Sequence, residues 1–264
     1  MPDIWKETVN IRFGHIDRSD RLTLWSAVNF FQEAAISHAA ELGAGRDALA
    51  RNGQAWVLSR LSLFVQRRPA YGETVEVSTW PRRHEKLFAL RDYAIRDAQG
   101  KALVRGRGGW LVLDMKKHKP LRVQPIVEAM PPNDGIDAFP AGPAGLGHRE
   151  NLAKAGGRSA AYSDIDFNGH VNNARYIQWI QDITGMDALT KAGQIRLDIN
   201  YLSEVMPGDF VELWSGAIEG EEPETNREDY PALPGPAFAY EGRRPESAQP
   251  VFRAELRTGS VPCG

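Results

Sequence analysis

Hydrophobic residues recur every three or four positions near the N-terminus, which is the spacing that places side chains on one face of a helix. The stripe consists of Leu24, Val28, Phe31, Ala35, Ala39 and Leu42, and it ends near Gly43. Later segments are rich in β-branched and aromatic residues and often alternate: 56–66, 73–80, 86–97 and 102–114. This pattern predicts an amphipathic helix of about five turns, followed by strands of an antiparallel sheet.

The same order of elements occurs twice. Residues 13–33 align with residues 162–182 at an offset of 149, and residues 71–77 align with residues 207–213 at an offset of 136. In the second copy the predicted helix spans 173–191, and the predicted strands are QIRLDINYLSEV, DFVELWSGAI, AFAYEG and PVFRAELRTG. A repeated unit of one helix and several strands predicts an α+β chain in which each sheet covers its own helix.

The two copies define the predicted domains. Residues 121–158, between them, are dense in Pro and Gly and are predicted to be a linker. The N-terminal domain then covers 1–120 and the C-terminal domain 159–264. A second Pro- and Glu-rich stretch, 219–236, is predicted to be a long surface loop.

Composition excludes several classes of function. With 42% hydrophobic residues, 25% charged residues and a net charge of −2, the chain is typical of a soluble globular protein and does not suggest nucleic-acid binding. Cys263 is the only cysteine, so a disulfide framework, a cysteine metal cluster and a cysteine nucleophile are not expected. We find no signal peptide and no apolar run of about 18 residues, so we expect a cytoplasmic protein without a membrane segment.

Candidate chemistry lies in SDIDFNGHVNNARYIQWIQD, residues 163–182. Asp166, Asn168 and His170 alternate, so in an extended backbone they would share one face just ahead of the predicted helix. The helix N-terminus would add free N–H groups and a positive dipole, which suit a developing oxyanion from an ester or thioester. Asp and Asn are also common at turns and caps, and a single His is often a packing residue, so the motif alone favours the structural interpretation.

Comparison with the first copy changes that balance. Opposite Asn168 and His170 stand Ser19 and Arg21, although Asp or Ser would satisfy a cap in either copy. The second copy alone carries an amide and a titratable base at these positions. Glu204 ends a predicted strand and aligns with Arg68 of the first copy. Taken alone, such a residue is expected to be a solvent-exposed carboxylate.

The stretch DFNGHVNNARYIQWI resembles the signature of the plant and bacterial acyl-ACP thioesterases, Asp-x-Asn-x-His followed by Val-Asn-Asn and a Tyr-Ile-x-Trp-Ile helix. The resemblance continues in RLTLWSAVNFFQEAAISHAAELG and WVLSRLSLFVQRRPAYGETVEVSTW. It implies a double hotdog, in which two antiparallel β-sheets each wrap around a long central helix. It also implies hydrolysis of fatty acyl-acyl carrier protein, releasing free fatty acid in fatty acid biosynthesis, with the N-terminal domain as the acyl-binding half.

The resemblance carries a catalytic network over to Asp166, Asn168, His170 and Glu204. Many plant members have a cysteine after that glutamate, where this chain has Val205. We expect Glu204 and His170 to activate water and Asn168 to position the carbonyl, whereas Asp166 either orients the site or attacks directly. Thioester hydrolysis by such a network needs no cofactor or metal.

Acyl carrier protein is the expected partner, and the chain itself is expected to be a monomer or a homodimer. Because the carrier is strongly acidic, the basic pairs at 67–68, 82–83 and 116–117 are candidate docking points. Other possibilities are an acyl-CoA thioesterase or a hydratase of the same fold, and a noncatalytic acyl-binding module. We expect Asp17→Asn, in the copy without the polar set, to leave turnover largely unchanged.

Overall fold

A computed structural model describes residues 4–219 and 233–259 of the chain. Most of the predicted surface loop at 219–236 therefore lies outside the described residues. The chain divides into two compact units. The first comprises Met1–Leu63 with Arg68–Pro143, and the second comprises Phe64–Arg67 with Ala144–Gly264.

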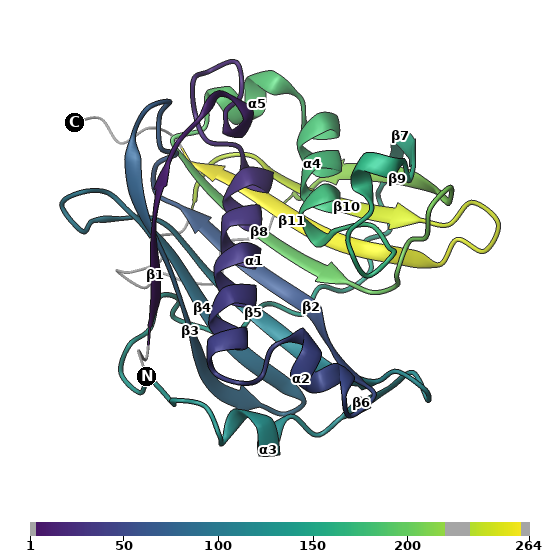
Figure 1. Cartoon of the computed structure of the whole chain (residues 1–264). Coiled ribbons are helices and arrows are strands. Elements are labelled where there is room, and N and C mark those ends of the chain that lie inside the picture. The colour runs from purple at the N-terminus through teal and green to yellow at the C-terminus, as the bar shows by residue number, and fades with distance from the viewer. Residues whose placement is uncertain (1–3, 220–232, 260–264) are drawn as a thin grey trace. The chain divides into compact units, whose positions relative to one another are not determined.

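The first unit is an antiparallel sheet with one long helix. Its elements are β1 (Trp5–Asn10), η1 (Phe13–His15), α1 (Leu24–Glu41), α2 (Arg46–Ala50), β2 (Gln54–Val65), β3 (Thr74–Glu85), β4 (Phe88–Arg96), β5 (Ala102–Asp114), β6 (Lys119–Leu121) and α3 (Gln124–Val127). The strand order is β1-β3-β4-β5-β2, with β6 paired to β5. Figure 1 shows α1 lying along one face of this sheet.

The long helix α1 follows the predicted stripe. Thr23 caps its N-terminus by accepting the N–H of Ser26 at 3.2 Å. Phe31 is buried and stacks on Tyr93 of β4 with ring centroids 4.8 Å apart. Full burial of a side chain of this size contributes roughly 1.5–3 kcal/mol, so the apolar face holds the helix on the sheet.

The second unit repeats this plan with a shorter helix. Its elements are β7 (Ala153–Ser159), η2 (Tyr162–Asp164), α4 (Asn173–Thr184), α5 (Met186–Thr190), β8 (Gln194–Tyr201), β9 (Phe210–Ala217), β10 (Ala237–Arg243) and β11 (Pro250–Gly259). The strand order is β8-β11-β10-β9-β7. The prediction of a single helix over 173–191 is wrong. The first helix, α4, ends before Gly185, where φ is +88°, and a separate short helix, α5, follows.

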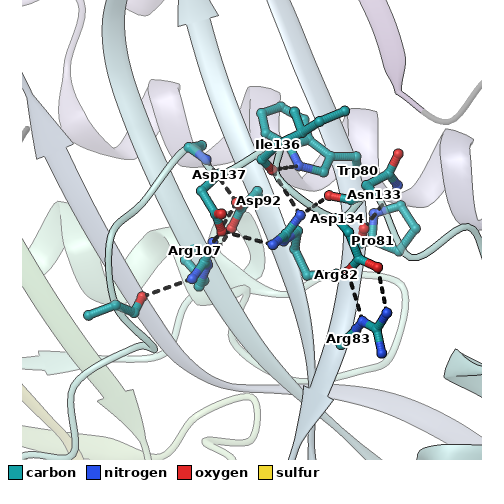
Figure 2. A network of polar contacts seen from close by, with 12 residues as sticks. Trp80, Pro81, Arg82, Arg83, Asp92, Arg107, Asn133, Asp134, Ile136 and Asp137 are labelled. Carbon is teal, nitrogen blue, oxygen red and sulfur yellow. Dashed lines mark hydrogen bonds and ion pairs between the residues drawn. The ribbon is translucent and has the colours of Figure 1, made fainter.

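Arginines of the first sheet hold the segment after α3, as Figure 2 shows. Arg107 on β5 donates to the buried carboxylate of Asp92 on β4, with Nε–Oδ1 and Nη2–Oδ2 distances of 2.5 and 2.7 Å. Its Nη2 also lies 2.7 Å from Oδ1 of Asp137, which Arg82 on β3 reaches at 2.9 Å. Pro and Gly exclude regular structure from this part of the predicted linker, but ion pairs fix it to the sheet.

Candidate active site

Asp166 organises a tight loop between η2 and α4, which we call the second loop (residues 165–171). Its N–H donates to the carbonyl of His170 at 3.0 Å, and its own carbonyl accepts the N–H of Gly169 at 3.0 Å. Its Oδ1 accepts the N–H of Asn168 at 2.8 Å. The backbone is thus a closed turn, with Gly169 at φ +87°, rather than the extended segment that the alternation suggested. The carboxylate stabilises the turn that carries Asn168 and His170.

The N-terminus of α4 follows directly, as predicted, but part of its hydrogen-bonding capacity is used locally. Asn172 caps the helix by accepting the N–H of Ala174 on Oδ1 at 2.8 Å, and its carbonyl accepts the N–H of Arg175 at 2.9 Å. These two amides are therefore not available to a substrate oxyanion. The positive end of the helix dipole remains as an electrostatic contribution.

Glu204 follows β8 and meets the second loop. The N–H of Val171 donates to the carbonyl of Val205 at 2.9 Å and joins the two segments. Oε1 of Glu204 lies 3.7 Å from Nε2 of His170, and the side chains are 54% and 25% exposed. Both groups can therefore be reached by solvent. The structure places the four predicted site residues on two joined segments of the second unit.

Tyr176 of α4 is close to the same groups. Burial raises the pKa of its phenol well above the ordinary value, and the charges of Glu204 and Asp166 act in the same direction. A backbone hydrogen bond from Val205 and the charge of Arg244 act in the opposite direction. The phenol therefore stays protonated near neutral pH. Tyr176 lies within the family signature but was not assigned a role in the site, and Arg244 was not identified because it lies outside every motif.

The first unit contains a loop of the same backbone design, which we call the first loop (residues 16–22). Asp17 accepts the N–H of Asp20 on its carbonyl at 3.0 Å and the N–H of Ser19 on Oδ1 at 2.9 Å. Bridges Ile16–Leu22 and Ile165–Val171 close the two loops at equivalent positions. The repeat predicted at an offset of 149 is therefore confirmed in its hydrogen bonds.

The side chains of the first loop are arranged differently. The guanidinium of Arg68, whose side chain is 7% exposed, binds Oδ2 of Asp17, and the hydroxyl of Ser19 donates to Oδ1 at 2.5 Å. Burial acts to raise the pKa of Asp17, but the hydrogen bonds from Ser19 and Arg68 hold it below its ordinary value. Within the described part of the chain, no Lys or Arg pairs with Asp166. Only the second loop leaves its carboxylate without a cation.

The basic pairs considered as docking points have different environments. Arg68 is buried in its ion pair, and Arg82 and Arg83 bind aspartates of the segment after α3 (Figure 2). Lys116 and Lys117 are exposed in the turn that follows β5. The structure therefore favours only the last pair as a free basic surface.

An α+β chain with two copies of one helix-and-sheet unit, and a polar loop at the helix N-terminus of the second copy, defines a narrow class of proteins. The model of the acyl-ACP thioesterase N-terminal domain matches residues 2–130, and that of the acyl-ACP thioesterase C-terminal domain matches residues 152–230. The chain belongs to the acyl-ACP thioesterase family, which confirms the resemblance found in the sequence.

Curated relatives include chloroplastic plant proteins. A palmitoyl-acyl carrier protein thioesterase of Cuphea hookeriana is 26% identical over 218 residues, which cover 76% of this chain and 52% of the relative. Oleoyl-acyl carrier protein thioesterase 2 of Arabidopsis thaliana is 24% identical over 226 residues, covering 79% of this chain and 61% of the relative. The chain thus spans about half the length of most curated relatives that it matches.

Solved structures agree with the fold. An acyl-ACP thioesterase from Bacteroides thetaiotaomicron matches with a TM-score of 0.79 and 25% identity, over 97% of both chains. The 12:0-ACP thioesterase from Umbellularia californica matches with a TM-score of 0.76 and 20% identity, over 96% of this chain and 93% of that one. None of the helices in the described residues has the length and apolar character to span a membrane.

Proposed function

We propose that this chain hydrolyses the thioester between a fatty acyl group and acyl carrier protein. The observation that carries the proposal is the difference between the two loops. In the second, Asp166, Asn168, His170 and Glu204 lie on two joined segments, whereas in the first a buried arginine neutralises the aspartate. The family supports the same reaction, and the relatives named above are thioesterases of acyl carrier protein.

The chemistry begins with water. His170 and Glu204 take a proton from a water molecule as its oxygen attacks the thioester carbonyl carbon. The amide of Asn168 donates to the oxyanion that forms, and removing such a donor typically costs about 3–4 kcal/mol of transition-state stabilisation. The carbon–sulfur bond then breaks, and the base returns the proton to the departing thiolate.

Asp166 serves to orient the site in this proposal. Its Oδ1 accepts the backbone N–H of Asn168 at 2.8 Å, and its Oδ2 lies 3.5 Å from the Asn168 side-chain nitrogen. A carboxylate in these contacts holds the amide that faces the substrate. Direct attack by Asp166 is the alternative, and it would leave a covalent acyl-enzyme that rapid quenching and mass spectrometry would detect.

The N-terminal domain is proposed to receive the acyl group, in a double hotdog whose two sheets each wrap around one helix. Its own loop is unsuited to hydrolysis, because Arg68 occupies the position of Glu204 and binds Asp17. A unit free of catalytic demands can specialise in binding an apolar chain. The basic turn at Lys116 and Lys117 is the proposed contact for the acidic carrier.

The direct test is an assay of the purified chain against matched acyl-ACP and acyl-CoA substrates, with release of free thiol and free fatty acid measured together. We expect both products in equal amounts, with a higher kcat/KM for the carrier-protein thioesters. Preference for acyl-CoA would assign the chain to a different thioesterase activity. Tight acyl binding without product release would show a noncatalytic binding module.

A further inference from the structure

Arg244 opens the turn between β10 and β11 and reaches back to the segment that holds Glu204. Its Nη2 donates to the backbone carbonyl of Glu204 at 2.7 Å, and its Nη1 donates to Oδ2 of Asp209 at 2.8 Å. Charge-assisted bonds of this kind are roughly twice as strong as neutral ones. One guanidinium therefore fixes both ends of the turn 204–209.

Asp209 completes this arrangement from the other side. Its Oδ2 also accepts the N–H of Met206 at 3.0 Å. The hydrogen bonds from Arg244 and from the Met206 amide hold the pKa of Asp209 below its ordinary value, so the carboxylate is charged near neutral pH. The turn is thus closed by an ion pair together with a backbone hydrogen bond.

The hydrogen bond from Arg244 fixes the backbone position from which the Glu204 side chain extends. This side chain is 54% exposed, so burial alone does not fix its position. The next residue, Val205, is fully buried, and its carbonyl accepts the N–H of Val171 in the second loop at 2.9 Å. Main-chain anchoring at Glu204 and Val205 therefore sets the approach of the Glu204 carboxylate to His170.

The first unit provides an internal comparison. There Glu73 accepts the N–H of Ala70 at 3.0 Å, as Asp209 accepts that of Met206. The turn between β4 and β5, however, opens with Asp97, which accepts the N–H groups of its own turn. In the unit whose loop is neutralised, the position that corresponds to Arg244 is therefore held by an anion, Asp97. Both units have the capping carboxylate, Glu73 or Asp209. Only the unit with the polar site residues has an arginine at the position that opens the hairpin turn.

We propose that Arg244 is a positioning residue for the hydrolysis assigned above: it holds Glu204 at the distance from His170 at which the two groups activate water. This inference rests on the proposed function. Arg244 touches no reacting atom, and its contribution passes through Glu204. Misplacement of a catalytic group by about 1 Å can lower a rate by about 100-fold, so the loss of this anchor should be visible in kcat.

The test is a double-mutant cycle of Arg244→Met and Glu204→Gln, measured as kcat and KM for one acyl-ACP substrate. We expect Arg244→Met alone to lower kcat roughly 10- to 100-fold with KM within about twofold. In the Glu204→Gln background it should lower kcat no further, since the group that it positions is already disabled. A residue that only stabilises the fold would give the same loss in both backgrounds.

Two further variants, a conservative replacement and a control, complete the test. Arg244→Lys retains a cation that can reach one of the two acceptors, so its kcat should lie between those of the parent and Arg244→Met. It replaces Arg244→Met in the cycle if the latter does not fold. Arg158→Met is the matched control, because Arg158 forms an exposed ion pair with Asp182 in the same unit, and it should keep the parental kcat.

The outcomes separate the two proposals. An active parent with additive losses in the cycle, or with Arg244→Met at the parental kcat, overturns the positioning role alone. A parent that releases no acid from any thioester overturns the proposed function and this inference with it. A loss of kcat that disappears in the Glu204→Gln background supports both.

Discussion

Asp17 and Asp166 hold the same turn in two copies of one loop, and their neighbours decide what each carboxylate can do. Arg68 binds the first, whereas the corresponding residue near the second is Glu204, 3.7 Å from His170. A change of sign at one position therefore separates a structural ion pair from a site with a base. Under the proposed function, the carboxylate that lacks a cation is the one that belongs to the catalytic site.

At this scale Asp17→Asn should reduce stability without reducing the rate of the folded enzyme. The substitution removes the Asp17 carboxylate from the buried Arg68 guanidinium, which we expect to cost about 1–3 kcal/mol; this is less than for a fully buried pair, because the Asp17 side chain is 22% exposed. Urea unfolding at neutral pH measures the loss. An unchanged unfolding midpoint would show that the ion pair contributes nothing.

The same pair predicts a pH dependence with a defined sign. The pKa of Asp17 is lower in the folded chain than its ordinary value of 3.8, so its stabilisation is present above that value and is lost as the pH falls through the folded pKa. The stability difference between parent and Asp17→Asn should therefore be constant from neutral pH to about pH 5 and shrink below about pH 4. A difference that grows in acid would contradict the assignment.

The sequence could single out Asp166, Asn168 and His170 as candidate site residues, because they fall within one short motif ahead of a helix. Glu204 followed from the resemblance, and the repeat set it opposite Arg68. Arg244 could not be identified from the sequence, because it contacts Glu204 from another hairpin, 40 positions further along the chain. Contacts between distant turns leave no periodic signal.

At the scale of an element, the second loop depends on one backbone conformation. Gly169 has φ +87°, and an added Cβ would meet no atom within 4 Å, so any cost of substitution arises from the backbone alone. The equivalent residue of the first loop, Asp20, has φ +62°. The loop therefore accepts a residue that tolerates the left-handed region.

We expect Gly169→Asn to keep most of the parental kcat and Gly169→Val to lower it. A β-branched residue in this region costs about 1–3 kcal/mol of strain and would displace the carbonyl of His170 that closes the turn. Steady-state kinetics with thermal melting of both variants measures the effect. Equal kcat for the two variants would show that the loop geometry does not control the reaction.

Element boundaries were predictable where one periodicity ran without interruption. The stripe from Leu24 predicted α1 closely, and the alternating segments predicted most of the strands. The helix after Asn173 was predicted too long, because apolar spacing continues past Gly185, whose positive φ ends α4. Strand β7 was missed because its sequence, AKAGGRS, is small and mostly exposed and shows no alternation.

At the scale of the whole molecule, buried ion pairs contribute to the order of segments that have no regular structure. Asp92 is fully buried and takes two hydrogen bonds from Arg107, which also binds Asp137 of the segment after α3. Composition indicated a linker there, because Pro and Gly signal the absence of helix and strand. It could not show which charges from distant strands would hold the segment.

Arg107→Met should therefore be strongly destabilising, by about 3–5 kcal/mol, since it leaves the Asp92 carboxylate buried and unpaired. Arg83→Met is the matched control: Arg83 and Asp134 form an ion pair with side chains 71% and 55% exposed, so water screens it and its loss should barely move the unfolding midpoint. Urea unfolding of both variants compares them. Similar midpoints for the two would contradict the importance of the buried pair.

The central claim is that hydrolysis takes place at the second loop and Glu204 and not at the first loop, and kcat for acyl-ACP hydrolysis by folded His170→Ala and Asp166→Asn tests it most directly. Circular dichroism and melting confirm that each variant is folded before the assay. We predict that each substitution lowers kcat by at least about 100-fold relative to the parent, from the loss of a base or of the group that orients the carbonyl donor. Hydrolysis at the parental rate by both variants would contradict the account.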